Sequence, residues 1–199
     1  PEFAKQEGSL FFQQRNEANH IVSLDLSNNI ASSPFPLIQS EFSHHYPDFS
    51  PIANKLTYVS NESGYYELWI SDSDGKNRQK LTLLNKNIRY PKWSNNGKSI
   101  AFLAPNDAFN GEKIYVIDLY TRRIKLLNSN FAKHNRPTWT PDDKNIITTV
   151  YDKDHTDLYK IDVSTSKAER ITFDNARYGV VQPDNSLVYS RIGGGLWRK

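Results

Sequence analysis

The sequence contains neither cysteine nor methionine in its 199 residues. Without cysteine, a disulfide framework, a thiolate metal site and a cysteine nucleophile are excluded. Because the chain also begins with Pro1, we expect it to be a mature product or a piece of a longer polypeptide. Long hydrophobic runs are missing too: the longest, such as Ile100–Ala104, fall far short of the roughly 18 apolar residues of a membrane span.

An excess of charge of one sign is also missing. The 25 Lys and Arg residues nearly balance the 22 Asp and Glu residues, which leaves a net charge of +3. The charges are scattered and alternate in sign, as is typical of a solvated surface. Nucleic-acid-binding domains instead gather Lys and Arg on one face, so we expect this chain to bind no nucleic acid.

What the sequence does contain is an internal repeat. Near copies of one segment stand at Tyr46–Val59 (YPDFSPIANKLTYV), Tyr90–Leu103 (YPKWSNNGKSIAFL) and Arg136–Val150 (RPTWTPDDKNIITTV). The repeat has a period of about 45 residues, which is typical of propeller blades. Its copies are aligned on one position, occupied by Pro1, Pro47, Pro91, Pro137 and, in a degenerate fifth copy, Gly179.

Each repeat predicts four short strands. A strand with an aromatic residue (Phe3, Phe49, Trp93, Trp139) is followed by a tight turn and a β-branched or aromatic run, then by a polar loop, an alternating strand and a fourth strand. We therefore predict an all-β propeller of four-stranded antiparallel blades, about four and a half of them. The units cover about 1–46, 47–90, 91–136, 137–178 and, in part, 179–199. An open propeller end would expose strand edges and favour self-association.

The repeat resembles the TolB-type (WD40-like) β-propeller family along the whole chain. The resemblance is carried by segments such as RPTWTPDDKNIITTV, the alternating strand DLYKIDV and the closing AERIT. It implies the propeller fold and, through that fold, a central channel. The residues just before each repeat anchor are then expected to link one blade to the next at one mouth of the channel.

That placement gives a candidate binding rim. We expect it to comprise His44, His45, Tyr46, Arg89, Tyr90, His134, Arg136, Arg177 and Tyr178. A cationic and aromatic rim suits a small anionic ligand or an acidic segment of a protein partner. Alternatively, the tyrosines pack between blades and the cations are merely solvated. Since histidine recurs at His44 and His134, we hypothesise that protonation near pH 6–7 tunes binding at this rim.

No catalytic motif is present. The sequence lacks G-x-S-x-G, H-E-x-x-H and a P-loop, so we expect no enzyme, no catalytic residue and no cofactor. The segments Asp72–Asn77 (DSDGKN) and Ile192–Leu196 (IGGGL) are interpreted as turns between strands. Two histidines at equivalent repeat positions do not make a metal site, and none is expected.

The fold alone leaves three functions open. The ending Gly195–Arg198 (GLWR) resembles the C-terminal propeller region of CadC/ToxR-like winged-helix transmembrane transcriptional regulators, which implies a sensory domain outside the cytoplasm. A TolB-like periplasmic interaction scaffold is the first alternative. The second is the gating propeller of a prolyl-oligopeptidase-like serine peptidase whose catalytic domain is absent here. The first interpretation leads, and in the first two the domain is periplasmic or otherwise extracytoplasmic.

Overall fold

The computed structural model describes residues 3–6, 9–15, 18–26 and 33–199. Side chains are described for residues 18–26, 33–108 and 110–199. The repeat anchor Pro1 and the side chain of Phe3 therefore lie outside the described residues. In the described part, the structure consists of β-strands and one short 3-10 helix, η1 (Asp107–Phe109). The chain divides into two compact units, 1–93 and 94–199, each described by itself.

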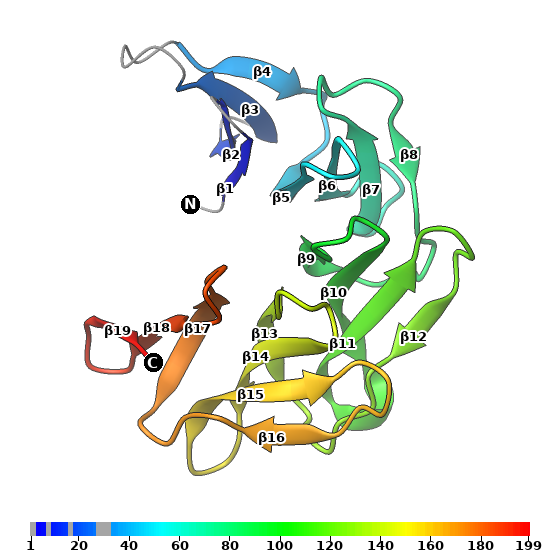
Figure 1. Ribbon diagram of the computed structural model, residues 1–199. Helices are drawn as coiled ribbons and strands as arrows, with labels where there is room; N and C mark the ends of the chain where they lie inside the picture. Colours follow the sequence, from blue (N-terminus) through cyan, green and yellow to red (C-terminus); the bar gives the residue numbers. More distant parts are fainter. Residues whose placement is uncertain (1–2, 7–8, 16–17, 27–32) are drawn as a thin grey trace. The chain divides into compact units, whose positions relative to one another are not determined.

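Unit 1 contains two complete four-stranded antiparallel sheets (Figure 1). The first has the order β1-β2-β3-β4, with β1 (Phe3–Gln6), β2 (Ser9–Arg15), β3 (Asn19–Asp25) and β4 (Phe35–Ile38). The second has the order β5-β6-β7-β8, with β5 (His44–Ser50), β6 (Lys55–Ser60), β7 (Glu67–Asp72) and β8 (Gln79–Lys80). The unit ends with β9 (Arg89–Trp93), which packs on β5 and β6.

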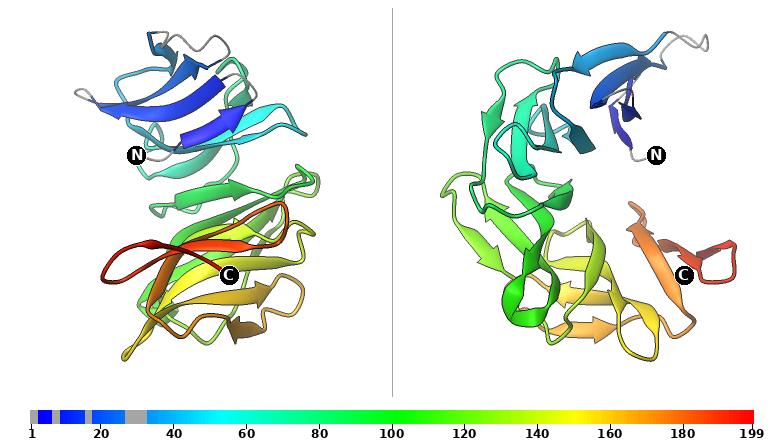
Figure 2. Two further views of the ribbon diagram at one scale, coloured as in Figure 1. Left: turned by 60° about the vertical axis from the view of Figure 1, so that its left-hand side comes forward. Right: turned by 180° about the vertical axis from the view of Figure 1, so that it is seen from behind.

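Unit 2 contains the remaining strands. β10 (Ser99–Asn106), β11 (Gly111–Asp118) and β12 (Ile124–Leu126) are antiparallel neighbours in the order β12-β11-β10. A fourth sheet runs in the order β13 (His134–Trp139), β14 (Asn145–Tyr151), β15 (Thr156–Asp162) and β16 (Ala168–Arg170). The last sheet has three strands, β17 (Ala176–Val181), β18 (Leu187–Arg191) and β19 (Leu196–Arg198). The twist of the individual sheets can be followed in Figure 2.

These sheets confirm the predicted all-β architecture of four-stranded antiparallel blades. Strands that follow one another in sequence are neighbours in every sheet, as in a meander. The segments Asp72–Asn77 and Ile192–Leu196 form the turns between β7 and β8 and between β18 and β19, as predicted.

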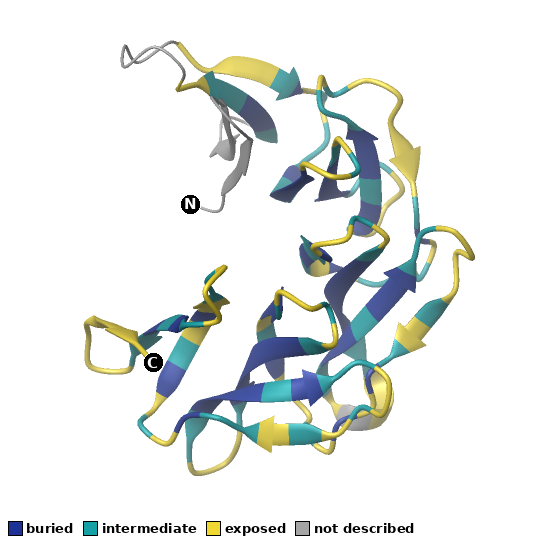
Figure 3. Cartoon of the chain, in the orientation of Figure 1, coloured by how far each residue is buried: buried dark blue, intermediate teal, exposed yellow. Residues whose placement is uncertain are grey.

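Within each unit, the core lies between successive sheets (Figure 3). In unit 1, Ile21 and Ile38 of the first sheet pack with Phe49, Leu56 and Tyr58 of the second. In unit 2, Ile147 and Leu158 pack with Ala176, Leu187 and Tyr189 of the following sheet. One blade cannot cover both of its apolar faces alone, so stacking of neighbours within each unit provides the burial that stabilises it.

Four first strands, β5, β9, β13 and β17, begin earlier than predicted. The residues before the anchors were expected in connecting segments, but they lie within β5, β9, β13 and β17. Each of these strands has one residue at positive φ immediately before the anchor: Tyr46 (54°), Tyr90 (51°), Arg136 (48°) and Tyr178 (57°). In β5, β13 and β17 the pairing with the next strand shifts register at this position, as in a β-bulge.

Candidate functional site

The bulged residue controls which side chains of the first strand are exposed. A left-handed conformation costs a residue with a side chain about 1–2 kcal/mol, and its recurrence in four strands makes it a regular part of the repeat. The anchors Pro47, Pro91 and Pro137 are buried, whereas Tyr46 and Tyr90 are half-buried and Arg136 is exposed. The bulge therefore turns one large side chain per blade away from the core.

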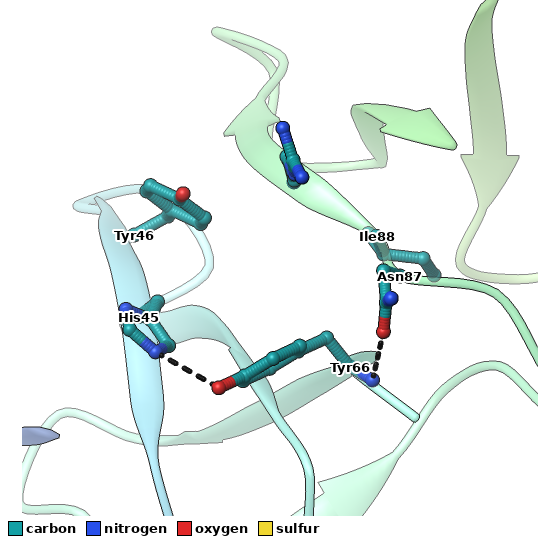
Figure 4. A pocket seen from close by; sticks show the side chains of 6 residues that line it. His45, Tyr46, Tyr66, Asn87 and Ile88 are labelled. Carbon is teal, nitrogen blue, oxygen red and sulfur yellow. Dashed lines mark hydrogen bonds between the residues drawn. The ribbon is translucent and has the colours of Figure 1, made fainter. Parts of the chain in front are cut away.

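In unit 1 the predicted residues His45, Tyr46 and Arg89 meet at a pocket of about 200 Å³. Figure 4 shows His45 and Tyr46 from β5 facing Tyr66, Asn87 and Ile88 from the segments before β7 and β9. His45 Nε2 and the Tyr66 hydroxyl lie 3.3 Å apart and share a hydrogen bond. Another predicted rim residue, Tyr90, packs beside this pocket, with its ring centroid 4.6 Å from that of Tyr46 and the two rings tilted.

The electrostatics of this pocket favour an anion. None of its six lining residues, His45, Tyr46, Tyr66, Asn87, Ile88 and Arg89, is acidic. Arg89 is exposed and carries a permanent positive charge. Burial lowers the pKa of His45, so its ring is neutral at pH 7. Arg89 is thus the formal charge of the pocket, and the remaining polar groups contribute hydrogen bonds.

His44 and His134 do not belong to an exposed rim. Both side chains are fully buried, and the residues at the same repeat position are the buried apolar Ile88 and Ala176. His44 Nε2 lies 2.9 Å from Ser40 Oγ, and His134 Nε2 lies 2.7 Å from Ser129 Oγ. The repeat position is therefore a core position that accepts histidine when a serine satisfies one ring nitrogen.

The titration of these two histidines lies outside the predicted pH range. Burial, followed by the charge of Arg78, lowers the pKa of His44 to about 4. Burial, followed by the charge of Lys113, lowers the pKa of His134 to about 3. Neither ring changes charge near pH 6–7, so the hypothesis that these two histidines tune binding in that range is corrected.

In unit 2 the predicted residues Arg136, Arg177 and Tyr178 form one cluster. The Arg136 guanidinium carbon lies 4.7 Å from the centroid of the Tyr178 ring, and that of Arg177 lies 5.6 Å from it. Tyr178 is 38% exposed, and its backbone N donates to Thr149 Oγ1 (3.0 Å). Two guanidinium groups beside one exposed aromatic ring provide charge, planar donors and apolar area together.

The sequence did not single out Tyr66 and Asn87 in unit 1. Tyr66 lies at the end of the polar loop before β7, and Asn87 precedes β9 by two residues. The polar loop that the repeat predicts before the alternating strand was the available signal for Tyr66. Nothing in the repeat pattern distinguishes Asn87 from its polar neighbours.

The Ser129–His134 pair is not an accessible catalytic dyad. Its hydrogen bond has a suitable length, but Ser129 is 3% exposed and His134 is fully buried, so a substrate has no access. Within the described residues, no three His, Asp or Glu side chains are grouped to hold a metal ion. The same part of the chain has no helix with the length and hydropathy needed to cross a membrane.

Comparison with known proteins places these features in a family. The family model of the TolB beta propeller domain matches residues 8–195. The Tol-Pal system protein TolB of Francisella tularensis subsp. mediasiatica (strain FSC147) is 30% identical over 129 residues, which are 60% of this chain and 29% of the relative. The chain therefore spans less than a third of the length of that curated relative.

Solved structures agree with the fold. The crystal structure of TolB from Acinetobacter baumannii has a TM-score of 0.79 and 25% identity over 96% of this chain and 49% of its own. A puromycin-hydrolyzing peptidase of Mycobacterium tuberculosis has a TM-score of 0.68 at 12% identity over 98% of this chain and 34% of its own, which is a likeness of fold alone. On the match over residues 8–195, the chain belongs to the TolB beta propeller domain family.

Proposed function

We propose that the chain is a non-catalytic protein-interaction propeller of the TolB type that acts outside the cytoplasm and binds an acidic segment of a protein partner. The observation that carries this proposal is the recurrent bulge, which directs Tyr46, Tyr90, Arg136 and Tyr178 away from the core. Tyrosine and arginine are enriched among the residues that contribute most of the binding energy of protein interfaces.

The family match favours the scaffold over the transcriptional regulator. The relatives and the structure of highest identity described above are TolB proteins, and these matches give no support to a winged-helix transmembrane regulator. The expected periplasmic location now rests on the TolB-type membership rather than on the regulator resemblance. A membrane-anchored parent protein has no further support.

The peptidase alternative is weaker for a different reason. Propeller peptidases are among the structures of similar fold, but the likeness is one of fold alone. The described residues offer a Ser–His pair that is buried, and exposed Tyr and Arg side chains that have no obvious role in hydrolysis. We therefore propose binding rather than catalysis as the role of the first-strand residues.

The proposal is tested by fluorescence anisotropy with three labelled peptides of equal length, one rich in glutamate, one in lysine and one neutral. We expect the full chain to bind the glutamate peptide best. The double variant Arg136→Gln/Arg177→Gln should weaken that binding about tenfold. The control Arg122→Gln/Arg123→Gln removes the same charge from an exposed turn and should leave it unchanged. Equal binding of all three peptides would contradict the proposal.

A further inference from the structure

The pocket of unit 1 offers a fixed set of hydrogen-bond donors. The Arg89 guanidinium can only donate, and its planar fork matches a carboxylate. The Tyr46 hydroxyl can also donate. These two side chains line the same pocket, in which no lining residue carries a negative charge.

The orientation of Asn87 is set by the backbone. Its Oδ1 accepts a hydrogen bond from the Tyr66 backbone N (3.4 Å), as drawn in Figure 4. The carbonyl end of the amide is therefore used, and the NH₂ end adds another donor. The Ile88 backbone N donates to the Tyr66 carbonyl oxygen (2.8 Å), and Ile88 is 1% exposed. These contacts hold the two segments together, so little conformational entropy is lost when a ligand binds.

His45 supports the pocket as a neutral ring. Its Nε2 lies 3.3 Å from Asn19 Nδ2 and 3.3 Å from the Tyr66 hydroxyl. An amide nitrogen can only donate, so Nε2 accepts and the ring carries its proton on Nδ1. The ring thus helps to fix the position of the Tyr66 hydroxyl, and Arg89 supplies the charge at neutral pH.

The volume of the pocket limits the ligand. At about 200 Å³ it is smaller than the roughly 300–1,000 Å³ of sites that enclose a drug-sized molecule or cofactor. One side chain or a small organic acid is the size of ligand that such a pocket accepts.

We propose that this pocket binds a single carboxylate, carried by a glutamate or aspartate side chain in the acidic segment of the partner. Arg89 pairs with the charge, and the Asn87 amide donates a hydrogen bond to the same group, while the Tyr66 hydroxyl donates to His45 and stays a wall of the pocket. The inference rests on the proposed function, because it assigns one recognition site to the interaction surface. A free dicarboxylate such as succinate presents the same chemistry, and the test separates the two sources.

The test compares a labelled glutamate-rich peptide with its glutamine twin on the full chain, with succinate as a competitor. We expect the glutamate peptide to bind at least about tenfold more tightly than its twin, and Arg89→Gln to remove about that advantage. Lys86→Gln is the matched control. Lys86 carries the same charge three residues before Arg89, and its side chain does not line the pocket. Asn87→Asp keeps the acceptor for the Tyr66 backbone N but replaces the donor with a negative charge, so it should also weaken binding, whereas Asn85→Asp adds the same charge outside the pocket lining and should not.

The outcomes separate this site from the wider proposal. If the glutamate peptide binds and is weakened by Arg136→Gln/Arg177→Gln but not by Arg89→Gln, the interaction surface stands and the pocket is refuted. If succinate binds in an Arg89-dependent way and no peptide binds, the pocket stands as a small-acid site and the protein-interaction function fails. Circular dichroism and the thermal midpoint of Arg89→Gln must match the wild type. If they do not, Asn87→Asp against Asn85→Asp decides, and equal binding by these two refutes the pocket.

Discussion

His44 and His134 show how a titratable residue is accommodated at a core position. The same position of the repeat holds Ile88 and Ala176, which are also buried. A neutral imidazole fits there because it is largely apolar and one ring nitrogen is satisfied by Ser40 or Ser129. The charged form lacks this advantage, so the cost of protonation appears as a pH dependence of stability.

We predict that the chain loses stability as the pH falls from about 6.5 to about 4. The pKa of His44 in the folded chain is about 4, against 6.5 ordinarily, so the unfolded chain binds more protons within this window. The stabilising contribution of the neutral ring is present above pH 6.5 and is lost as the pH approaches the folded value. For His44 this amounts to the order of 3 kcal/mol.

The variant His44→Ile, which copies Ile88, should make the thermal midpoint fall less steeply over that pH range. The charged and titratable groups around His44 are Glu62 at 3.8 Å, Arg78, His20 and His45, and all of them remain in the variant. His155→Gln is the control, because the His155 side chain is only partly buried. An unchanged slope in His44→Ile would show that the ring does not contribute to acid sensitivity.

At the scale of elements, the hairpin turn that follows β5, β9, β13 and β17 is a regular local structure. The same turn position holds Asn54, Gly97, Asp143 and Asn185, all at positive φ. In unit 2 the Asp143 carboxylate accepts hydrogen bonds from the backbone N of Asn95 (2.7 Å) and of Asn96 (2.9 Å). One residue thus closes its own turn and joins it to the turn of the preceding blade.

Asp143→Gly separates these two roles. Glycine adopts positive φ without strain, but it removes the carboxylate and leaves two backbone N–H groups without this acceptor. We expect a net loss of about 1–2 kcal/mol in the free energy of unfolding, measured by urea denaturation. Asn185→Gly, at the equivalent turn of β17 and β18, should change the stability little. Equal effects of the two variants would show that the turn-to-turn bonds do not stabilise the unit.

At the scale of the whole molecule, net charge does not explain binding to an acidic partner. The excess of +3 is small and is spread over 199 residues. The relevant charges are those that the first strands collect, namely Arg89 in unit 1 and Arg136 and Arg177 in unit 2. These groups are exposed or half-buried, so salt should screen them.

We therefore predict that the affinity for the glutamate-rich peptide falls several-fold when the ionic strength rises from about 0.05 M to about 0.3 M. Anisotropy titrations at constant pH measure this change. The neutral peptide serves as the control and should show little dependence on salt. Affinity for the glutamate peptide that does not depend on salt would contradict a charge-based interface.

The sequence predicted the blades well and the binding residues only in part. The anchor spacing, the aromatic residues Phe49, Trp93 and Trp139, and the turn residues were enough for the strands, because alternation and turn chemistry are local properties. The first-strand boundaries were less accurate. We interpreted the residues just before the anchor proline as a connection between strands. In the structure a β-bulge at this position lets the strand continue past the proline.

Aligning the repeats also did not predict the different side-chain chemistry at one buried position. Glu67, Lys113 and Asp157 occupy equivalent positions in β7, β11 and β15, and all three are buried. Glu67 and Asp157 accept hydrogen bonds from Thr82 and Thr172, whereas Lys113 Nζ donates to the carbonyl oxygen of Ser129 (2.6 Å). Residues of opposite charge thus fix the same connection, which no pattern of residue types reveals.

The sequence by itself determined the all-β repeat, the turns and the family, because these depend on residues close together in the chain and on a regular period. The tertiary structure decided which of the predicted rim residues are exposed. Burial is a property of neighbours distant in sequence, so the structure assigned His44 and His134 to the core and His45 and Arg89 to a pocket with Tyr66 and Asn87. Which of these residues are buried determines the charge of the surface, because burial keeps a histidine neutral while an exposed arginine keeps its charge.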